Sequence, residues 1–307
     1  MPNRSEYAAV TFVLGSTMQI VKPYPNIFAF YDGRIPGVRA HSPEQNWLDD
    51  GAFTLGTASF AIVEGAEAIV YDAHMSLIHA RMIRDFLEGQ GVRDMRLVVS
   101  HWHTDHVAGN AVFSDCEVIA NRFTKEALIA NRDELENNDP PIKPLIMPNR
   151  IFDSELELRV GDTVVELRHL DIHSYDETVA LLPQSGVLLA GDTLEDTVTY
   201  VSEPDRLEQH LVDLARMESW DFESILPNHG TLERITSGGY DRTFITATRL
   251  YVEKLLRLKD EPELADLDMR SFAAEALATG GVEYFEAYEP VHANNVKSVL
   301  ASIRKAV

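Results

Sequence analysis

Cysteine, positive charge and long apolar runs are all scarce in this sequence, and each shortage narrows what the protein can be. Cys116 is the single cysteine among 307 residues, so no disulfide can form within the chain, and a reducing cytoplasmic compartment fits. Lysine and arginine number 27 against 49 acidic residues, which leaves a net charge of −22. Because such a surface repels polyanions, we expect neither nucleic acid nor a membrane as partner. No run approaches the roughly 20 apolar residues of a membrane-spanning helix.

Apolar residues and their spacing predict a layered α/β fold. They make up 45% of the chain, which is enough for a full core. Tight turns between strands are predicted at residues 64–65, 161–162 and 183–186. Residues 8–15 are predicted to form a further strand, and apolar side chains recur at helical spacing over residues 78–87 and 207–217. Strands that alternate with helices and also form hairpins indicate mixed sheets.

The end of the chain and two long loops stand apart from this pattern. Further helices are predicted over residues 242–258, 269–278 and 294–306. We therefore divide the chain into a main domain over residues 1–235 and a helical appendage over residues 236–307. Residues 33–51 and 137–149 contain several prolines and are predicted to be loops. Long loops in a compact domain often wall a binding site, which we expect here.

Residues 100–109, SHWHTDHVAG, concentrate ligand-type side chains directly after an apolar strand. His101 and His103 are two positions apart, so an extended chain points both in the same direction. Asp105 and His106 follow where a helix is expected to begin, and neighbouring side chains there diverge towards a second point. This arrangement suits two metal ions. Imidazole together with carboxylate suits zinc, iron or manganese.

The segment His101-Trp102-His103-Thr104-Asp105-His106 resembles the HxHxDH signature of the metallo-β-lactamase superfamily. Further parts of that pattern occur in order along the chain: Asp72 in AIVYD, His173 in HLDIHSYDE, Asp192 in VLLAGDTL and His229 in ILPNHG. The resemblance covers residues 20–235. It implies an α/β fold in which two mixed β-sheets flanked by helices form a four-layer αβ/βα sandwich, here followed by the C-terminal helical appendage.

The resemblance also implies a role for each of these residues. One metal ion would be held by His101, His103 and His173, and the other by Asp105, His106 and His229. Asp192 would bridge the two ions, so Asp105 and Asp192 are the catalytic candidates. A water molecule between two divalent cations, zinc before iron or manganese, would attack as hydroxide because the cations lower its pKa. Asp72 would orient a ligand histidine from behind.

Two departures from the family's usual pattern change the backbone around the ligands. Asp171-Ile172 stands where Pro-Gly usually precedes the third-motif histidine. Asn228 stands where a glycine usually precedes the last histidine. Both changes alter local backbone freedom but keep the ligands.

The residues around Asp192 bear on the reaction. An aspartate there resembles the dinuclear hydrolases, whereas true β-lactamases carry cysteine or serine. The family's N-acyl homoserine lactonases have a tyrosine shortly after this aspartate. Leu194 and Glu195 occupy those places here and Tyr200 comes later, which weakens the lactonase interpretation.

We therefore expect a dinuclear metallohydrolase that cleaves a lactone, thioester or phosphodiester bond in a small molecule. The alternatives are a mononuclear metal dioxygenase of the same superfamily, and a binding or signalling protein that keeps the fold without catalysis. A complete set of seven ligands favours hydrolysis over both. A homodimer is left open.

Specificity is expected to come from outside the ligand motifs, because those motifs are shared by enzymes with many substrates. Trp47 in the first loop and Tyr284, Phe285, Tyr288 and His292 in the appendage are predicted to line the substrate pocket. The alternative is that these aromatic residues simply attach the appendage to the core.

Overall fold

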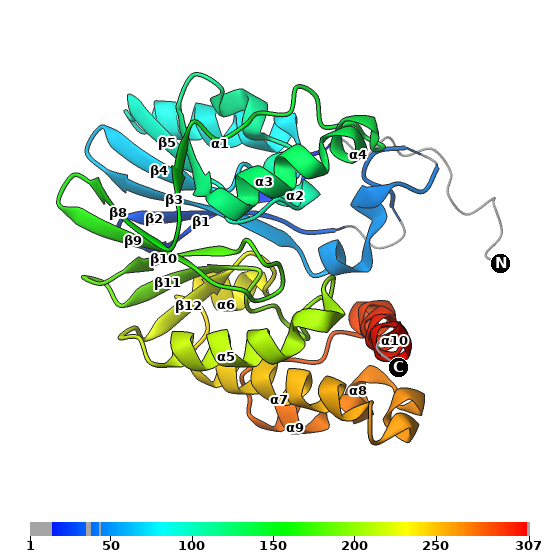
Figure 1. Ribbon diagram of the computed structural model, residues 1–307. Coiled ribbons are helices and arrows are strands. Elements are labelled where there is room, and N and C mark those ends of the chain that lie inside the picture. Colours follow the sequence, from blue (N-terminus) through cyan, green and yellow to red (C-terminus); the bar gives the residue numbers. More distant parts are fainter. Residues whose placement is uncertain (1–13, 35–37, 43, 306–307) are drawn as a thin grey trace.

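The computed structural model describes residues 14–34, 38–42 and 44–305, which form two β-sheets packed together with helices on the outer faces (Figure 1). This layered arrangement confirms the predicted α/β fold class. Of the strand expected over residues 8–15, residues 8–13 lie outside the described part of the chain. Its last two residues belong to a turn that precedes the first strand.

The first sheet is mixed and runs in the order β1-β2-β3-β4-β5-β6-β7. Its strands are β1 (Met18–Tyr24), β2 (Ile27–Asp32), β3 (Thr57–Glu64), β4 (Glu67–Tyr71), β5 (Asp94–Val98), β6 (Glu117–Asn121) and β7 (Arg150–Phe152). Neighbours are antiparallel from β1 to β4 and parallel from β4 to β7. Nearly all of β3 and β4 is buried, as expected for strands with helices on one face and a second sheet on the other.

The second sheet is also mixed and runs in the order β12-β11-β10-β9-β8. Its strands are β8 (Glu155–Val160), β9 (Thr163–His169), β10 (Thr178–Leu182), β11 (Val187–Gly191) and β12 (Ser224–Pro227). Only β11 and β12 pair in parallel. The three predicted hairpin turns are confirmed, since they join β3 to β4, β8 to β9 and β10 to β11.

Ten α-helices are found in the described residues. They are α1 (Leu77–Gly89), α2 (Thr104–Val107), α3 (Arg122–Ala130), α4 (Arg132–Asn137), α5 (Leu207–Glu218), α6 (Leu232–Thr236), α7 (Thr243–Arg257), α8 (Met269–Phe272), α9 (Ala274–Ala278) and α10 (Glu289–Lys305). Two predictions need correction. The helix expected over residues 269–278 is two short helices, and α10 begins five residues before position 294. Pro290 lies in the first turn of α10, where its missing N–H has no helical partner to lose.

Three apolar clusters hold the layers together. Ile62 and Val98 of the first sheet pack with Leu167 and Leu189 of the second, between the sheets. A second cluster joins the outer face of the first sheet to α1. The third joins the second sheet to α5, α7 and α10; α5 and α7 lie on the outer side of this sheet in Figure 1, and α10 lies at the right, beyond the strands.

The C-terminal helices therefore share their core with the second sheet, and the division at residue 235 stays a prediction. Within residues 14–34, 38–42 and 44–305 no helix combines the length and the apolar character needed to cross a bilayer.

Candidate metal centre

The seven predicted ligand residues come together where several strands end. His101 and His103 follow β5, and Asp105 and His106 lie in α2. His173, Asp192 and His229 come after β9, β11 and β12 in turn. The backbone of His103 is extended, with φ −65° and ψ 157°, and α2 begins at the next residue. The expected change from strand-like chain to helix within the motif is thus confirmed, and it directs the first two histidines and the next two ligands to different points.

Three histidines form the first group of candidate ligands. His103 Nδ1 lies 2.9 Å from His101 Nε2 and 3.0 Å from His173 Nε2. In a tetrahedral zinc site with metal–nitrogen distances of about 2.0–2.1 Å, neighbouring nitrogens are about 3.3 Å apart. Burial lowers the pKa of His103 to about 3, and burial with the nearby His106 also lowers the pKa of His101. Both rings are therefore neutral near pH 7 and keep a lone pair for a cation.

Two carboxylates and two imidazoles form the second group. Asp105 Oδ2 lies 3.2 Å from both His106 Nε2 and His229 Nε2. Burial alone would lower the pKa of His106. The carboxylates of Asp105 and Asp192 outweigh burial and raise this pKa well above its usual value. Asp192 Oδ1 is buried without a hydrogen-bond partner, and Asp105 Oδ2 contacts ligand-type imidazoles. Buried carboxylate oxygens need a positive partner, so the donor set fits a divalent cation.

Asp192 connects the two groups. Its Oδ2 atom lies 3.1 Å from His106 Nε2 and 3.4 Å from His229 Nε2 in the second group. The same atom lies 3.6 Å from His173 Nε2 and 3.8 Å from His101 Nε2 in the first group. One carboxylate oxygen therefore faces both sets of nitrogens, as the bridging role predicted for Asp192 requires.

Gly191 allows the chain to place Asp192 there. Its φ of +56° lies in the left-handed region that favours glycine. A Cβ atom at this position would lie 2.1 Å from Glu177 Oε1, so a larger residue could not fit without displacing that buried side chain. Gly191 thus allows the end of β11 to pass close to Glu177, the residue directly before β10.

A comparison with known families agrees with this geometry. The family model described as the metallo-beta-lactamase superfamily matches residues 53–263. The chain belongs to the metallo-β-lactamase superfamily. The matched region contains all seven candidate ligands and extends past residue 235 into the C-terminal helices.

Similar proteins and structures point the same way. A lactamase-like protein, notP, of Aspergillus sp. (strain MF297-2) is 24% identical over 204 residues. That match covers 64% of this chain and only 58% of the relative's own length. The structure of DIM-1 metallo-beta-lactamase exposed to ceftazidime is 19% identical, with a TM-score of 0.58 over 77% of this chain and 96% of the other. A metallo-beta-lactamase from Pontibacter korlensis is 14% identical, with a TM-score of 0.59 over 77% and 99%. These structures show the shared metallo-β-lactamase fold.

Each candidate ligand histidine except His103 has a polar partner at its other ring nitrogen. Asp72 Oδ2 lies 2.9 Å from His106 Nδ1, which agrees with the orienting role predicted for Asp72. Other partners are Glu177 Oε2 at 3.2 Å from His101 Nδ1, Glu195 Oε1 at 2.9 Å from His173 Nδ1, and the Gly56 carbonyl at 3.1 Å from His229 Nδ1. Such partners fix the orientation of metal-binding imidazoles.

Sequence reasoning did not assign Glu177 or Glu195 to the site. Both are buried, at 0% and 1% exposure, although glutamate is rarely buried without a partner. Each lies a few positions from a ligand, in HSYDE and in GDTLE, and that closeness in sequence was the available signal.

Asn228 is a third residue whose role only the structure shows. It is fully buried, and its Nδ2 donates to Asp72 Oδ2 at 2.7 Å. The same nitrogen lies 3.2 Å from His106 Nδ1. The departure from the usual glycine therefore adds a donor that holds the carboxylate behind a ligand histidine.

We predict that Asn228→Ala weakens binding of the cation next to His106 by about 10–100-fold, because loss of a partner behind a ligand typically has this effect. Competition with a chromophoric chelator would give the dissociation constant for each metal ion. Asn137→Ala is the control, since Asn137 is exposed, its side chain donates to Asp133 O, and it belongs to neither ligand group. Two unchanged constants in Asn228→Ala would contradict the assigned role.

A cavity of about 220 Å³ opens over the candidate ligands. The lining includes His103, Asp105, His173, Asp192 and His229 of the candidate ligands. The other lining residues are Asp50, Ala52, Phe53, Trp102, Thr104, Glu134, Leu135, Glu195, Tyr200 and Ser202. Asp50 belongs to the first predicted loop, whereas the 137–149 loop contributes no residue to this lining.

The five residues predicted to line the pocket do not do so in the described structure. Tyr288 is fully buried, with its hydroxyl donating to Ala52 O at 2.8 Å. His292 is 3% exposed and lies 3.0 Å from the Tyr251 hydroxyl. Tyr284 and Phe285 pack against the cluster under the second sheet. Their large apolar areas pack the appendage against the core, which was the alternative to lining the pocket.

Trp47 stands one layer behind the pocket. Its indole packs edge to face with Phe53, with ring centroids 6.0 Å apart, and its Nε1 donates to Pro140 O at 3.0 Å. The two long loops are thus joined to each other, and the first of them reaches the cavity through Asp50. Trp47 therefore supports the Phe53 wall and is not part of it.

The appendage acts on the pocket from behind. The Tyr288 hydroxyl holds the Ala52 backbone in place through its hydrogen bond to Ala52 O. Phe285 N donates to Thr197 Oγ1 at 3.0 Å. Asn295 of α10 binds Thr199 O and Val201 N on both sides of Tyr200. Because Ala52 and Tyr200 line the cavity, the C-terminal helices position two of its walls.

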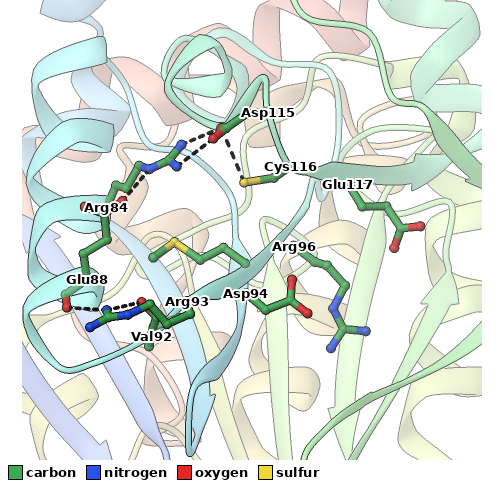
Figure 2. Close-up of a pocket in the computed structure, with 10 residues that line it drawn as sticks. Arg84, Glu88, Val92, Arg93, Asp94, Arg96, Asp115, Cys116 and Glu117 are labelled. Atoms are coloured by element: carbon green, nitrogen blue, oxygen red, sulfur yellow. Dashed lines mark hydrogen bonds and ion pairs between the residues drawn. The ribbon is translucent and has the colours of Figure 1, made fainter.

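A larger cleft, of about 590 Å³, lies by the first residues of β5 and β6, away from the metal centre (Figure 2). Figure 2 shows the Arg84 guanidinium turned towards the Asp115 carboxylate. Arg84 binds Asp115 through two nitrogens, at 2.5 and 2.8 Å. Burial raises the pKa of the Cys116 thiol to about 11, so it remains protonated near pH 7. The cleft thus presents paired charges and an unreactive thiol.

Proposed function

We propose that this protein is a metal-dependent hydrolase that holds two divalent cations, best matched by zinc, and cleaves an ester-like bond in a small molecule. The observation that carries the proposal is the position of Asp192 Oδ2, within 3.1–3.8 Å of four nitrogens from both ligand groups. Nitrogen and carboxylate ligands in compact sets are typical of zinc. The two complete groups support two cations, and so hydrolysis, over a one-metal oxygenase.

The chain's own residues have separable tasks in this reaction. When bound, the two cations supply Lewis acidity towards the scissile oxygen and lower the pKa of a water molecule. Asp192 would set the spacing between the two ligand groups, and its negative charge would offset the repulsion between the two cations. Burial raises the pKa of Tyr200 to about 12, so its hydroxyl stays protonated and can donate to a substrate oxygen in the cavity. Phe53 and Trp102 limit the access of bulk water.

The bond class follows from the charge supplied at the centre. A lactone, a thioester and a phosphodiester all develop negative charge on an oxygen during attack by water, which cations stabilise. The cavity of about 220 Å³ suits a small substrate. The similar structures are named as β-lactamases, and an amide-like lactam is the related bond that a screen should include.

The test combines metal analysis with a hydrolysis screen. Protein expressed with sufficient zinc should contain close to two metal equivalents, and a panel of lactones, thioesters, phosphodiesters and lactams should reveal turnover that is lost on chelation and restored by metal. His41→Gln is a suitable control variant, because His41 is exposed and lies outside both ligand groups. A well-folded protein with metal content near zero would overturn the proposal.

A further inference from the structure

The lining of the cavity is acidic and aromatic, and it contains neither lysine nor arginine. Asp50 and Glu134 add carboxylates beyond those of the candidate ligands. Glu195 is 1% exposed, lines the cavity, and its Oε2 atom has no hydrogen-bond partner. A buried carboxylate oxygen without a partner at the wall of a cavity is an unused acceptor for a ligand's hydrogen-bond donor or positive charge.

Asp50 lies outside the ligand groups, and a backbone hydrogen bond holds its side chain at the cavity wall. It precedes a short 3₁₀ helix, Gly51–Thr54, and one of its oxygens accepts from Ala52 N at 2.9 Å. No lysine or arginine of the described chain forms an ion pair with it, whereas its neighbour Asp49 is paired with Arg39. Arg34 contacts the Phe53 ring at 5.7 Å, but it pairs with Asp32 at 3.7 Å and is absent from the lining.

Three aromatic rings surround the candidate ligands at this cavity. Phe53 lies 6.0 Å from the His229 ring, Trp102 lies 5.0 Å from His103, and Tyr200 lies 6.4 Å from His173. Aromatic faces next to unpaired carboxylates are the arrangement that binds organic ammonium groups, through cation–π attraction and charge. Five buried carboxylates also surround the centre, so two divalent cations would not leave the cavity strongly positive. They are Asp72, Asp105, Glu177, Asp192 and Glu195.

We propose that the cavity selects a substrate that carries an ammonium group near its scissile bond, held by Asp50 among the Phe53, Trp102 and Tyr200 rings, and that it rejects substrates with a carboxylate there. This inference rests on the proposed function. The overall charge of −22 adds to it, because a negative surface raises the local concentration of cationic molecules and lowers that of anionic ones.

Three thiols of similar size test the inference without requiring turnover. 2-(Trimethylammonio)ethanethiol, 3,3-dimethylbutane-1-thiol and 3-sulfanylpropanoate carry a positive, a neutral and a negative group on a short chain that ends in a metal-binding sulfur. Their affinities for the zinc-loaded protein would be measured by calorimetry. We expect the ammonium thiol to bind about tenfold more tightly than the neutral one, and the carboxylate thiol to bind most weakly.

Asp50→Asn should lower the ratio between the ammonium and neutral thiols about tenfold, and comparing the two proteins cancels the difference in acidity between the free thiols. Asparagine can still accept from Ala52 N, so the cap and the local fold are kept. Asp133→Asn is the matched control: it removes the same charge from α4, next to Glu134 but outside the lining, and should leave the ratio unchanged.

The outcomes separate the two proposals. Equal binding of all three thiols, or preference for the carboxylate, would overturn the inference about substrate charge while leaving the metal centre in place. A ratio that survives in Asp50→Asn would remove Asp50 from the role. Failure of every thiol to bind protein with two metal equivalents would instead count against the proposed centre.

Discussion

Replacing Asp192 with alanine is expected to abolish most hydrolysis and to remove about one of the two metal equivalents. Its Oδ2 atom is the carboxylate oxygen that faces both ligand groups, at 3.1 Å from His106 Nε2 and 3.6 Å from His173 Nε2. Without it, two cations would repel each other across a buried space with no shared anion. We expect turnover to fall by roughly 10²–10³-fold, as when one preorganised electrostatic group is removed from a site.

The measurement is elemental analysis of the purified variant together with kcat/KM on a substrate found in the screen. Asp213→Ala is the matched control, because Asp213 is also buried and accepts from Asp171 N at 2.8 Å, yet it belongs to neither ligand group. That control should lose stability but keep both metal ions. Wild-type turnover by Asp192→Ala would show that this carboxylate is not part of the centre.

Replacing Asn295 with alanine is expected to lower the free energy of unfolding by about 3 kcal/mol, because buried polar groups left without a partner each cost about 1–3 kcal/mol. Asn295 is 1% exposed. Its Oδ1 accepts from Val201 N at 2.9 Å, and its Nδ2 donates to Thr199 O at 2.8 Å and to the Tyr251 hydroxyl at 3.0 Å. The change would also release Tyr200 from its place in the cavity wall, so KM should rise while metal content stays at two equivalents.

Denaturant unfolding, elemental analysis and a separation of kcat from KM would check this result. Asn294→Ala is the control, since the neighbouring side chain on α10 is exposed and should tolerate the change. An unfolding free energy equal to that of the wild type would mean that α10 does not hold the 199–201 segment in place.

The candidate metal centre was largely predictable from the sequence because four of its seven residues are local. His101, His103, Asp105 and His106 lie within six residues, and their directions follow from strand and helix geometry alone. Their roles as ligands, with those of His173, Asp192 and His229, remain predictions that the observed grouping supports. Asp72 also lies next to a candidate ligand histidine, as expected, and the structure shows that this histidine is His106.

Glu177, Glu195 and Asn228 escaped prediction for the opposite reason. Each acts through contacts with residues in another segment of the chain, and glutamate or asparagine beside a motif is usually a surface residue. The pocket prediction was wrong for Tyr288 and His292 because an aromatic side chain that faces a cavity and one that packs behind it have the same sequence pattern. Only the order of layers distinguishes the two, and here Ala52 and Tyr200 are in front.

By itself, the sequence determined the alternation of strands and helices, the three hairpins, the family and the candidate ligands, since these depend on side-chain periodicity and on short motifs. The tertiary structure alone decided that Glu177 and Glu195 stand behind histidines, which segments line the cavity and how the C-terminal helices support it. The physical reason is that these features are contacts between different segments of the chain, many of them far apart in sequence, such as Asn228 with Asp72 and Tyr288 with Ala52. Such contacts follow from how the two sheets and the outer helices pack, and no local pattern of residues encodes them.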